Sequence, residues 1–143
     1  MNHLITQKGV SDRVVCDSAG TASYHVGNPP DKRMNAAAQK KGITLTGSAR
    51  QFTAADFENF DLILAMDQSN YRDILSLDTQ HQYTDKVKLM CSFARHHSDT
   101  EVPDPYYGGE AGFDYVIDLL TDACEALLDE ALADSADYTE KAI

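Results

Sequence analysis

"DLILAMDQSNYRDILSL", residues 61–77, decides the fold. Its first half is a continuous apolar run, typical of a strand that is buried on both faces of a parallel sheet. Its second half spaces apolar residues in the helical period, and Asp67 or Ser69 can cap the helix that begins there. We therefore predict a buried strand over residues 61–66, followed directly by a helix.

The same alternation of strand and helix extends outward from this stretch. Further strands are predicted over residues 13–17 and 86–93, and further helices over residues 1–8, 28–42 and 113–131. The first of these helices should stop at Gly9, where a left-handed cap residue is expected. This alternation predicts an α/β fold, a three-layer doubly wound parallel sheet flanked by helices. We expect a single domain over residues 1–133 and a frayed acidic tail over residues 134–143, where the helical pattern stops.

The charge of the chain is concentrated at one end. Of 23 acidic residues, 13 lie within residues 99–143, together with only one of the 12 basic residues. An acidic C-terminal third argues against nucleic acid as a partner, because phosphate binding needs basic patches. The chain contains no apolar run long enough to span a membrane, and its first residues do not resemble a signal peptide.

The three cysteines are widely spaced and odd in number. Neither a Cys-x2-Cys pair nor a Cys/His pattern suited to zinc occurs, so we expect no metal and no cofactor. Free thiols fit a reducing compartment, and we predict a cytoplasmic protein.

Four motifs carry a specific resemblance: "DSAGT" after the first strand, "YHVGNPPDKRM", "GSARQFTAADFENFDLILAMDQSN" and "VPDPYYGG". Their order, spacing and residues resemble those of the low-molecular-weight protein tyrosine phosphatases, over roughly residues 1–132. The resemblance implies the hydrolysis of phosphotyrosine proteins or aryl phosphates through a cysteinyl phosphate.

The resemblance also implies roles for individual residues. Asp104, between Pro103 and Pro105, matches the aspartate that protonates the leaving tyrosine oxygen and then deprotonates the attacking water. A carboxyl group on such a rigid loop suits this role physically, because desolvation and the phosphate charge favour its protonated form. The other implied positions are two walls for the phosphotyrosine ring, Tyr106 with Tyr107 and Tyr24 with His25, and two braces of the phosphate loop, Ser18 and Asp67.

One part of the family pattern is absent from this sequence. The family's nucleophile lies in a Cys-x5-Arg loop, whereas here Ala22, His97 and Glu130 stand six residues after Cys16, Cys91 and Cys124. The resemblance implies that the family's first strand, nucleophile and phosphate-binding arginine would precede Met1. We therefore expect a truncated chain that is inactive by itself.

Two alternatives stay open. The chain could be a catalytically dead module that binds phosphotyrosine or another partner, or a relative of the arsenate reductases that share this fold.

A missing first strand would lie between the strands at residues 13–17 and 61–66, leaving two unpaired edges. Such edges would favour a homodimer or marginal stability.

Overall fold

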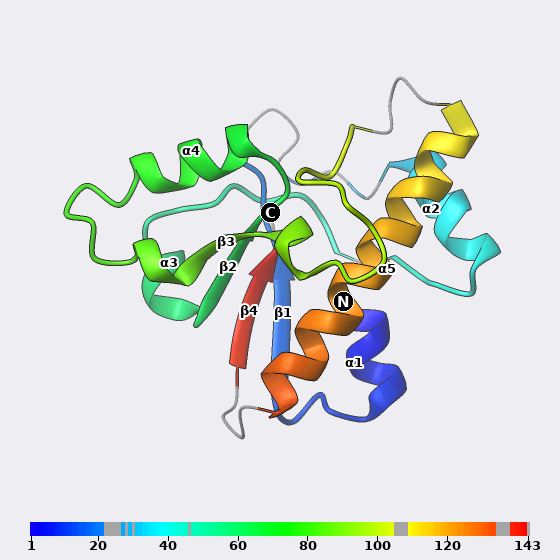
Figure 1. Cartoon of the computed structure of the whole chain (residues 1–143), viewed down its shortest axis with the longest axis horizontal. Helices are drawn as coiled ribbons and strands as arrows, with labels where there is room; N and C mark the ends of the chain where they lie inside the picture. Colours follow the sequence, from blue (N-terminus) through cyan, green and yellow to red (C-terminus); the bar gives the residue numbers. More distant parts are fainter. Residues whose placement is uncertain are drawn as a thin grey trace.

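A computed structural model describes residues 1–21, 27, 29, 31–45, 47–104, 109–133 and 138–142, the last of these as backbone only. Four parallel strands form one sheet in the order β1-β4-β2-β3 (Figure 1). The strands are β1 (Val14–Ser18), β2 (Leu62–Ala65), β3 (Val87–Leu89) and β4 (Tyr138–Ala142).

The helices cover both faces of this sheet. They are α1 (Asn2–Lys8), α2 (Lys32–Lys40), α3 (Asp56–Asn59), α4 (Gln68–Ser76) and α5 (Gly109–Ala133), with 3-10 turns η1 (Thr84–Lys86) and η2 (Met90–Phe93). Figure 1 shows α1 and α5 together on one side of the sheet and α3 and α4 on the other. The predicted three-layer, doubly wound α/β architecture is confirmed.

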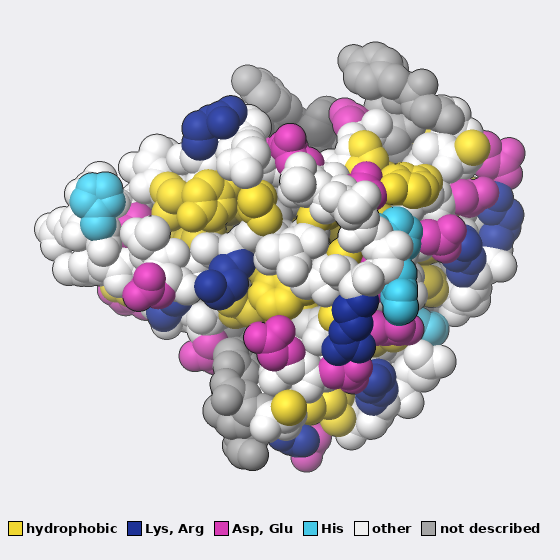
Figure 2. All heavy atoms as spheres, in the orientation of Figure 1, with side chains coloured by type: hydrophobic (Ala, Val, Ile, Leu, Met, Phe, Trp, Pro, Cys, Tyr) yellow, Lys and Arg dark blue, Asp and Glu magenta, His cyan; other side chains and the backbone are white. Residues whose placement is uncertain are grey.

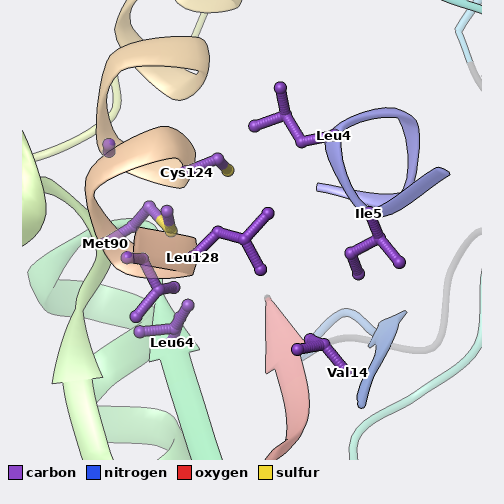
Figure 3. Packing of buried hydrophobic residues seen from close by; sticks show 9 residues of the cluster. Leu4, Ile5, Val14, Leu64, Met90, Cys124 and Leu128 are labelled. Atoms are coloured by element: carbon purple, nitrogen blue, oxygen red, sulfur yellow. The ribbon is translucent and has the colours of Figure 1, made fainter. Parts of the chain in front are cut away.

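The alternation of side chains along β2 builds a core on each face. Leu64 packs with α1 and α5, whereas Ile63 and Ala65 pack with α3 and α4, and all three are fully buried. Figure 3 shows the first cluster, in which Leu4 and Ile5 of α1 face α5 and the sheet. A strand that buries both faces has to be apolar throughout, which explains the uninterrupted run in the sequence.

Two predicted helix ends are confirmed. Helix α1 ends at Gly9, whose φ of 67° is the left-handed conformation that glycine adopts most readily. Helix α4 begins after Asp67, whose carboxylate accepts a hydrogen bond from the Asn70 amide at 2.7 Å.

The end of the chain differs from the expectation of a frayed tail. Backbone residues 138–142 form β4, which pairs in parallel with both β1 and β2. The two strand edges that we expected to be unpaired are therefore both paired, and the reason given for a homodimer falls away. Local sequence did not indicate a strand because Tyr-Thr-Glu-Lys-Ala lacks an apolar run, and the pairing partners on either side decide its conformation.

The third predicted strand is shorter than expected. Only Val87–Leu89 pairs with β2, and Met90–Phe93 turns into the 3-10 segment η2. This turn places Met90 and Cys91 in the core and directs the chain toward α5.

Candidate active site

The polar residues expected to form a site gather beyond the carboxyl ends of the strands. Ser18 is the last residue of β1, and Asp67 follows β2 after one intervening residue. Ligands of open α/β sheets bind at this edge, because parallel strands all end there and leave a crevice between their following loops. Ser18 and Asp67 therefore lie at the edge where a ligand is expected, and their role in a site stays a prediction.

The loop after β1 is held to its neighbour by backbone and side-chain contacts. The Gly20 amide donates to the Arg50 carbonyl and the Phe52 amide donates to the Gly20 carbonyl, each at 2.8 Å. The Arg50 guanidinium donates through Nε to Asp17 at 2.9 Å, and it donates to both carboxylate oxygens of Asp56 at 3.0 and 3.2 Å. Arg50 thus fixes the loop that follows Ser18. The side chain of Ser18 itself is exposed.

Asp67 is connected to that loop through the first turn of α4. Its carboxylate caps Asn70, and the Asn70 side chain donates to the Thr21 hydroxyl at 3.4 Å. Asp67 is partly buried. These contacts link the start of α4 to Thr21 in the loop after β1, and the role of Asp67 as a brace stays a prediction.

Asp104 lies at the end of a segment that is held at both ends, here named the acid segment (residues 95–104). At its C-terminal end the Val102 amide donates to the Met66 carbonyl at 2.8 Å, and the Glu101 carboxylate accepts from the Gln68 amide at 2.7 Å. These contacts flank Asp67 on both sides. The structure therefore brings exposed Asp104 to the same edge of the sheet as Asp67.

The N-terminal end of the acid segment is held by Asp122 of α5. The Asp122 carboxylate accepts from the amides of Arg95 at 3.1 Å and His96 at 2.9 Å, and it contacts Nδ1 of His97 at 2.7 Å. The side chain of Asp122 is only 6% exposed. In Figure 2, histidine side chains lie among acidic and basic ones on the face over α5.

Burial and hydrogen bonding act on Asp122 in opposite directions. Burial raises the pKa of its carboxyl group, but the hydrogen bonds from His97 and from the amides of His96 and Arg95 outweigh it and lower the pKa from 3.8 to about 2. Asp122 is therefore a carboxylate at neutral pH, and its negative charge is matched by three donors.

Sequence reasoning missed Glu101 and Asp122. Asp122 left one signal, because it lies within the otherwise apolar face of α5 beside buried Leu119 and Ala126. A carboxylate at such a position needs partners, and their identity depends on the fold.

Four predicted site residues lie outside the described part of the chain. These are Tyr24, His25, Tyr106 and Tyr107. Their role as substrate walls stays a prediction from the resemblance.

Cys91 does not have the environment of an activated nucleophile. Burial, helped by the charges of Asp99 and Glu101, raises the pKa of the Cys91 thiol, whereas a nucleophilic cysteine needs a lowered one. Cys124 is buried in the core cluster of Figure 3, and half-buried Cys16 packs against it. Among the described residues, no group of histidine, cysteine and carboxylate side chains is arranged to hold a metal ion.

Comparison with known proteins agrees with this arrangement. The sequence model of one protein family, the low molecular weight phosphotyrosine protein phosphatases, matches residues 1–137. The chain belongs to this family. The resemblance stated from the four motifs is thereby confirmed.

Relatives within the phosphatase family align over most of their length. The Synechocystis protein slr0328, whose name assigns it to the low molecular weight protein-tyrosine-phosphatases, is 57% identical over 90% of this chain and 82% of its own. The rat low molecular weight phosphotyrosine protein phosphatase is 39% identical over 89% of this chain and 80% of its own. The crystal structure of a protein tyrosine phosphatase from Entamoeba histolytica with Hepes in its active site superposes with a TM-score of 0.88, at 41% identity, over 94% of this chain and 85% of that one.

No helix within the described residues of this phosphatase-family chain is both long and apolar enough to cross a membrane.

Proposed function

We propose that this chain serves the hydrolysis of phosphotyrosine proteins or aryl phosphates, with Asp104 as the general acid and base. The observation that carries the proposal is the attachment of Asp104 beside Asp67 through the Val102–Met66 and Glu101–Gln68 hydrogen bonds. A general acid has to be held within hydrogen-bond reach of the leaving oxygen. The attachment of its segment on both sides of Asp67 supplies such a fixed position.

In this proposal Asp104 moves a proton twice. It first protonates the phenolic oxygen as the bond to phosphorus breaks, and it then removes a proton from the water that releases phosphate. Ser18 and Asp67 brace the loop that holds the phosphate, while Tyr24, His25, Tyr106 and Tyr107 flank the aromatic ring. The braces are supported by their position at the carboxyl edge of the sheet, and the ring contacts rest on the family resemblance.

The 143 residues contain no Cys-x5-Arg sequence to supply the nucleophile and the phosphate-binding arginine. We therefore propose that this chain does not turn over substrate by itself. The family's reaction proceeds through a cysteinyl phosphate, and Asp104 has no intermediate to act on without that thiolate.

One assay tests both parts of the proposal. The rate of p-nitrophenyl phosphate hydrolysis is measured for the 143-residue chain and for a version extended upstream to an in-frame Cys-x5-Arg. We expect hydrolysis only by the extended version. Hydrolysis by the 143-residue chain would refute the argument about the nucleophile, and its absence from both would refute the enzymatic function.

The absence of Cys-x5-Arg favours a second candidate, a catalytically inactive module that binds a phosphotyrosine protein. Measuring the binding of a phosphotyrosine peptide to the 143-residue chain by calorimetry separates this candidate from the first, because a binding module should bind it without hydrolysis. An arsenate reductase is less well supported, since its disulfide relay needs reactive cysteines, whereas Cys91 and Cys124 are buried.

A further inference from the structure

Glu101 and Asp122 carry an inference that rests on the proposed function of Asp104. We propose that Glu101 and Asp122 are positioning residues, which hold the acid segment at its two ends and thereby fix Asp104 at the edge of the sheet. The two carboxylates act on different elements, one on α4 and the other through α5.

Glu101 connects the acid segment to the N-terminus of α4. Its carboxylate accepts the amide of Gln68, the first residue of that helix. Helix N-terminal amides have no partner within the helix and carry partial positive charge, so they favour a carboxylate. Asp67 caps the same turn through Asn70, which means that one helix end orients both the brace and the segment of the general acid.

The backbone between Glu101 and Asp104 has little freedom. The Val102 amide is bound to Met66, and only Pro103 separates Val102 from Asp104. Proline fixes its own φ and restricts the residue before it to extended conformations. A shift at Glu101 is therefore passed on to Asp104 rather than absorbed between them.

Asp122 fixes the other end of the acid segment. It satisfies two consecutive backbone amides and the His97 ring, which stacks edge-on against Tyr115 with centroids 5.8 Å apart. The Tyr115 hydroxyl in turn donates to Asp99. Residues 95–99 are thus tied to α5, and only one residue lies between these contacts and Glu101.

This arrangement matters because the efficiency of a general acid depends on its placement. Misplacement of a catalytic group by about 1 Å can lower the rate by about a hundredfold. A segment held at one end only would let Asp104 sample many positions relative to the leaving oxygen. Two anchors reduce that sampling before substrate binds.

The first measurement is amide hydrogen exchange by NMR in the 143-residue chain. Glu101→Ala should speed exchange of the Gln68 and Val102 amides by about tenfold, since a hydrogen bond to a charged acceptor is lost. Glu101→Gln keeps a carbonyl acceptor and should restore most of the protection. Glu125→Ala, which removes an exposed carboxylate of α5, is the matched control. Unchanged exchange in Glu101→Ala would overturn the anchoring role.

The second measurement uses the form that hydrolyses p-nitrophenyl phosphate. A misplaced general acid lowers the rate most for substrates with a poor leaving group, which depends on protonation. Glu101→Ala should therefore lower kcat for phenyl phosphate by about tenfold and for p-nitrophenyl phosphate by only about twofold, with KM unchanged. Equal losses for both substrates would indicate a merely structural role and overturn the proposal.

The two measurements fail differently. If no form of the chain hydrolyses either phosphate ester, the proposed function fails and the positioning role fails with it, whatever the exchange data show. If hydrolysis occurs but Glu101→Ala and Asp122→Asn both leave the leaving-group dependence unchanged, only the positioning role is refuted. Glu101→Ala keeps this test decisive where a change at buried Asp122 unfolds the chain, because the Glu101 side chain lies at the surface.

Discussion

Replacing Asp122 with asparagine should destabilise the fold in a way that depends on pH. The pKa of Asp122 is lowered from 3.8 to about 2, and each pKa unit corresponds to about 1.4 kcal/mol of stability. The ionised form of this buried carboxyl group therefore contributes roughly 2 kcal/mol to the free energy of unfolding at pH 7. Asparagine keeps one acceptor oxygen but loses the charge. We therefore expect Asp122→Asn to lower the free energy of unfolding at pH 7 by about the contribution of that charge.

The sign of the pH dependence follows from the direction of the shift. A carboxyl group with a lowered pKa in the folded state stabilises the fold above its unfolded pKa, and this stabilisation is lost as the pH falls through the folded pKa. With these two values, about half of the contribution of Asp122 disappears between pH 5 and pH 3. The difference in stability between the wild type and Asp122→Asn should shrink over the same range.

Urea unfolding followed by circular dichroism at pH 7, 5 and 3 measures this difference. Glu125→Ala, on the exposed face of the same helix, controls for a general loss of negative charge. A free-energy difference that stays constant from pH 7 to pH 3 would refute the reasoning, because it would show that the charge on Asp122 does not support the acid segment. An increase in stability at pH 7 would refute it equally.

Three further outcomes are expected. Asp104→Asn in the hydrolytically active form should lower kcat by about 10² to 10⁴, the usual contribution of a general acid, and an undiminished kcat would exclude that role. Arg50→Lys keeps the charge but loses the two-pronged contact with buried Asp56, so unfolding free energy should fall by about 1–3 kcal/mol in thermal melts; no change would show that the contact is dispensable. Iodoacetamide labelling at pH 7, followed by mass spectrometry, should modify half-buried Cys16 before buried Cys91, whose pKa is raised, and the reverse order would contradict the inert environment of Cys91.

Local sequence patterns predicted the elements whose burial is decided locally. The apolar run at residues 62–65 can be read as a buried strand because both of its faces are covered by helices. Gly9 marked the end of a helix because the backbone there adopts the left-handed conformation. Asp67 marked the start of a helix because the first turn needs a side-chain acceptor for its amides. The run at residues 86–93 was less informative, since a short apolar stretch is compatible with either a strand or a turn of helix.

The candidate site was predictable only in part. Ser18, Asp67 and Asp104 could be proposed as site residues because they lie in motifs whose residues are adjacent in sequence. Glu101 and Asp122 were missed because their partners are remote in the sequence: Gln68 lies 33 positions before Glu101, and His96 lies 26 positions before Asp122. Such pairs depend on the packing of α5 and α4 around the sheet, and no local pattern encodes that distance.

The strand with the weakest sequence signal, β4, sets the spacing of the site. Because β4 lies between β1 and β2, the residues at the ends of those strands are separated by two interstrand spacings, or about 9–10 Å. Ser18 and Asp67 are therefore too far apart for a direct hydrogen bond, and the contact between their elements runs through Asn70 and Thr21 instead. The spacing between the two sides of the candidate site thus depends on β4, the strand that separates β1 from β2.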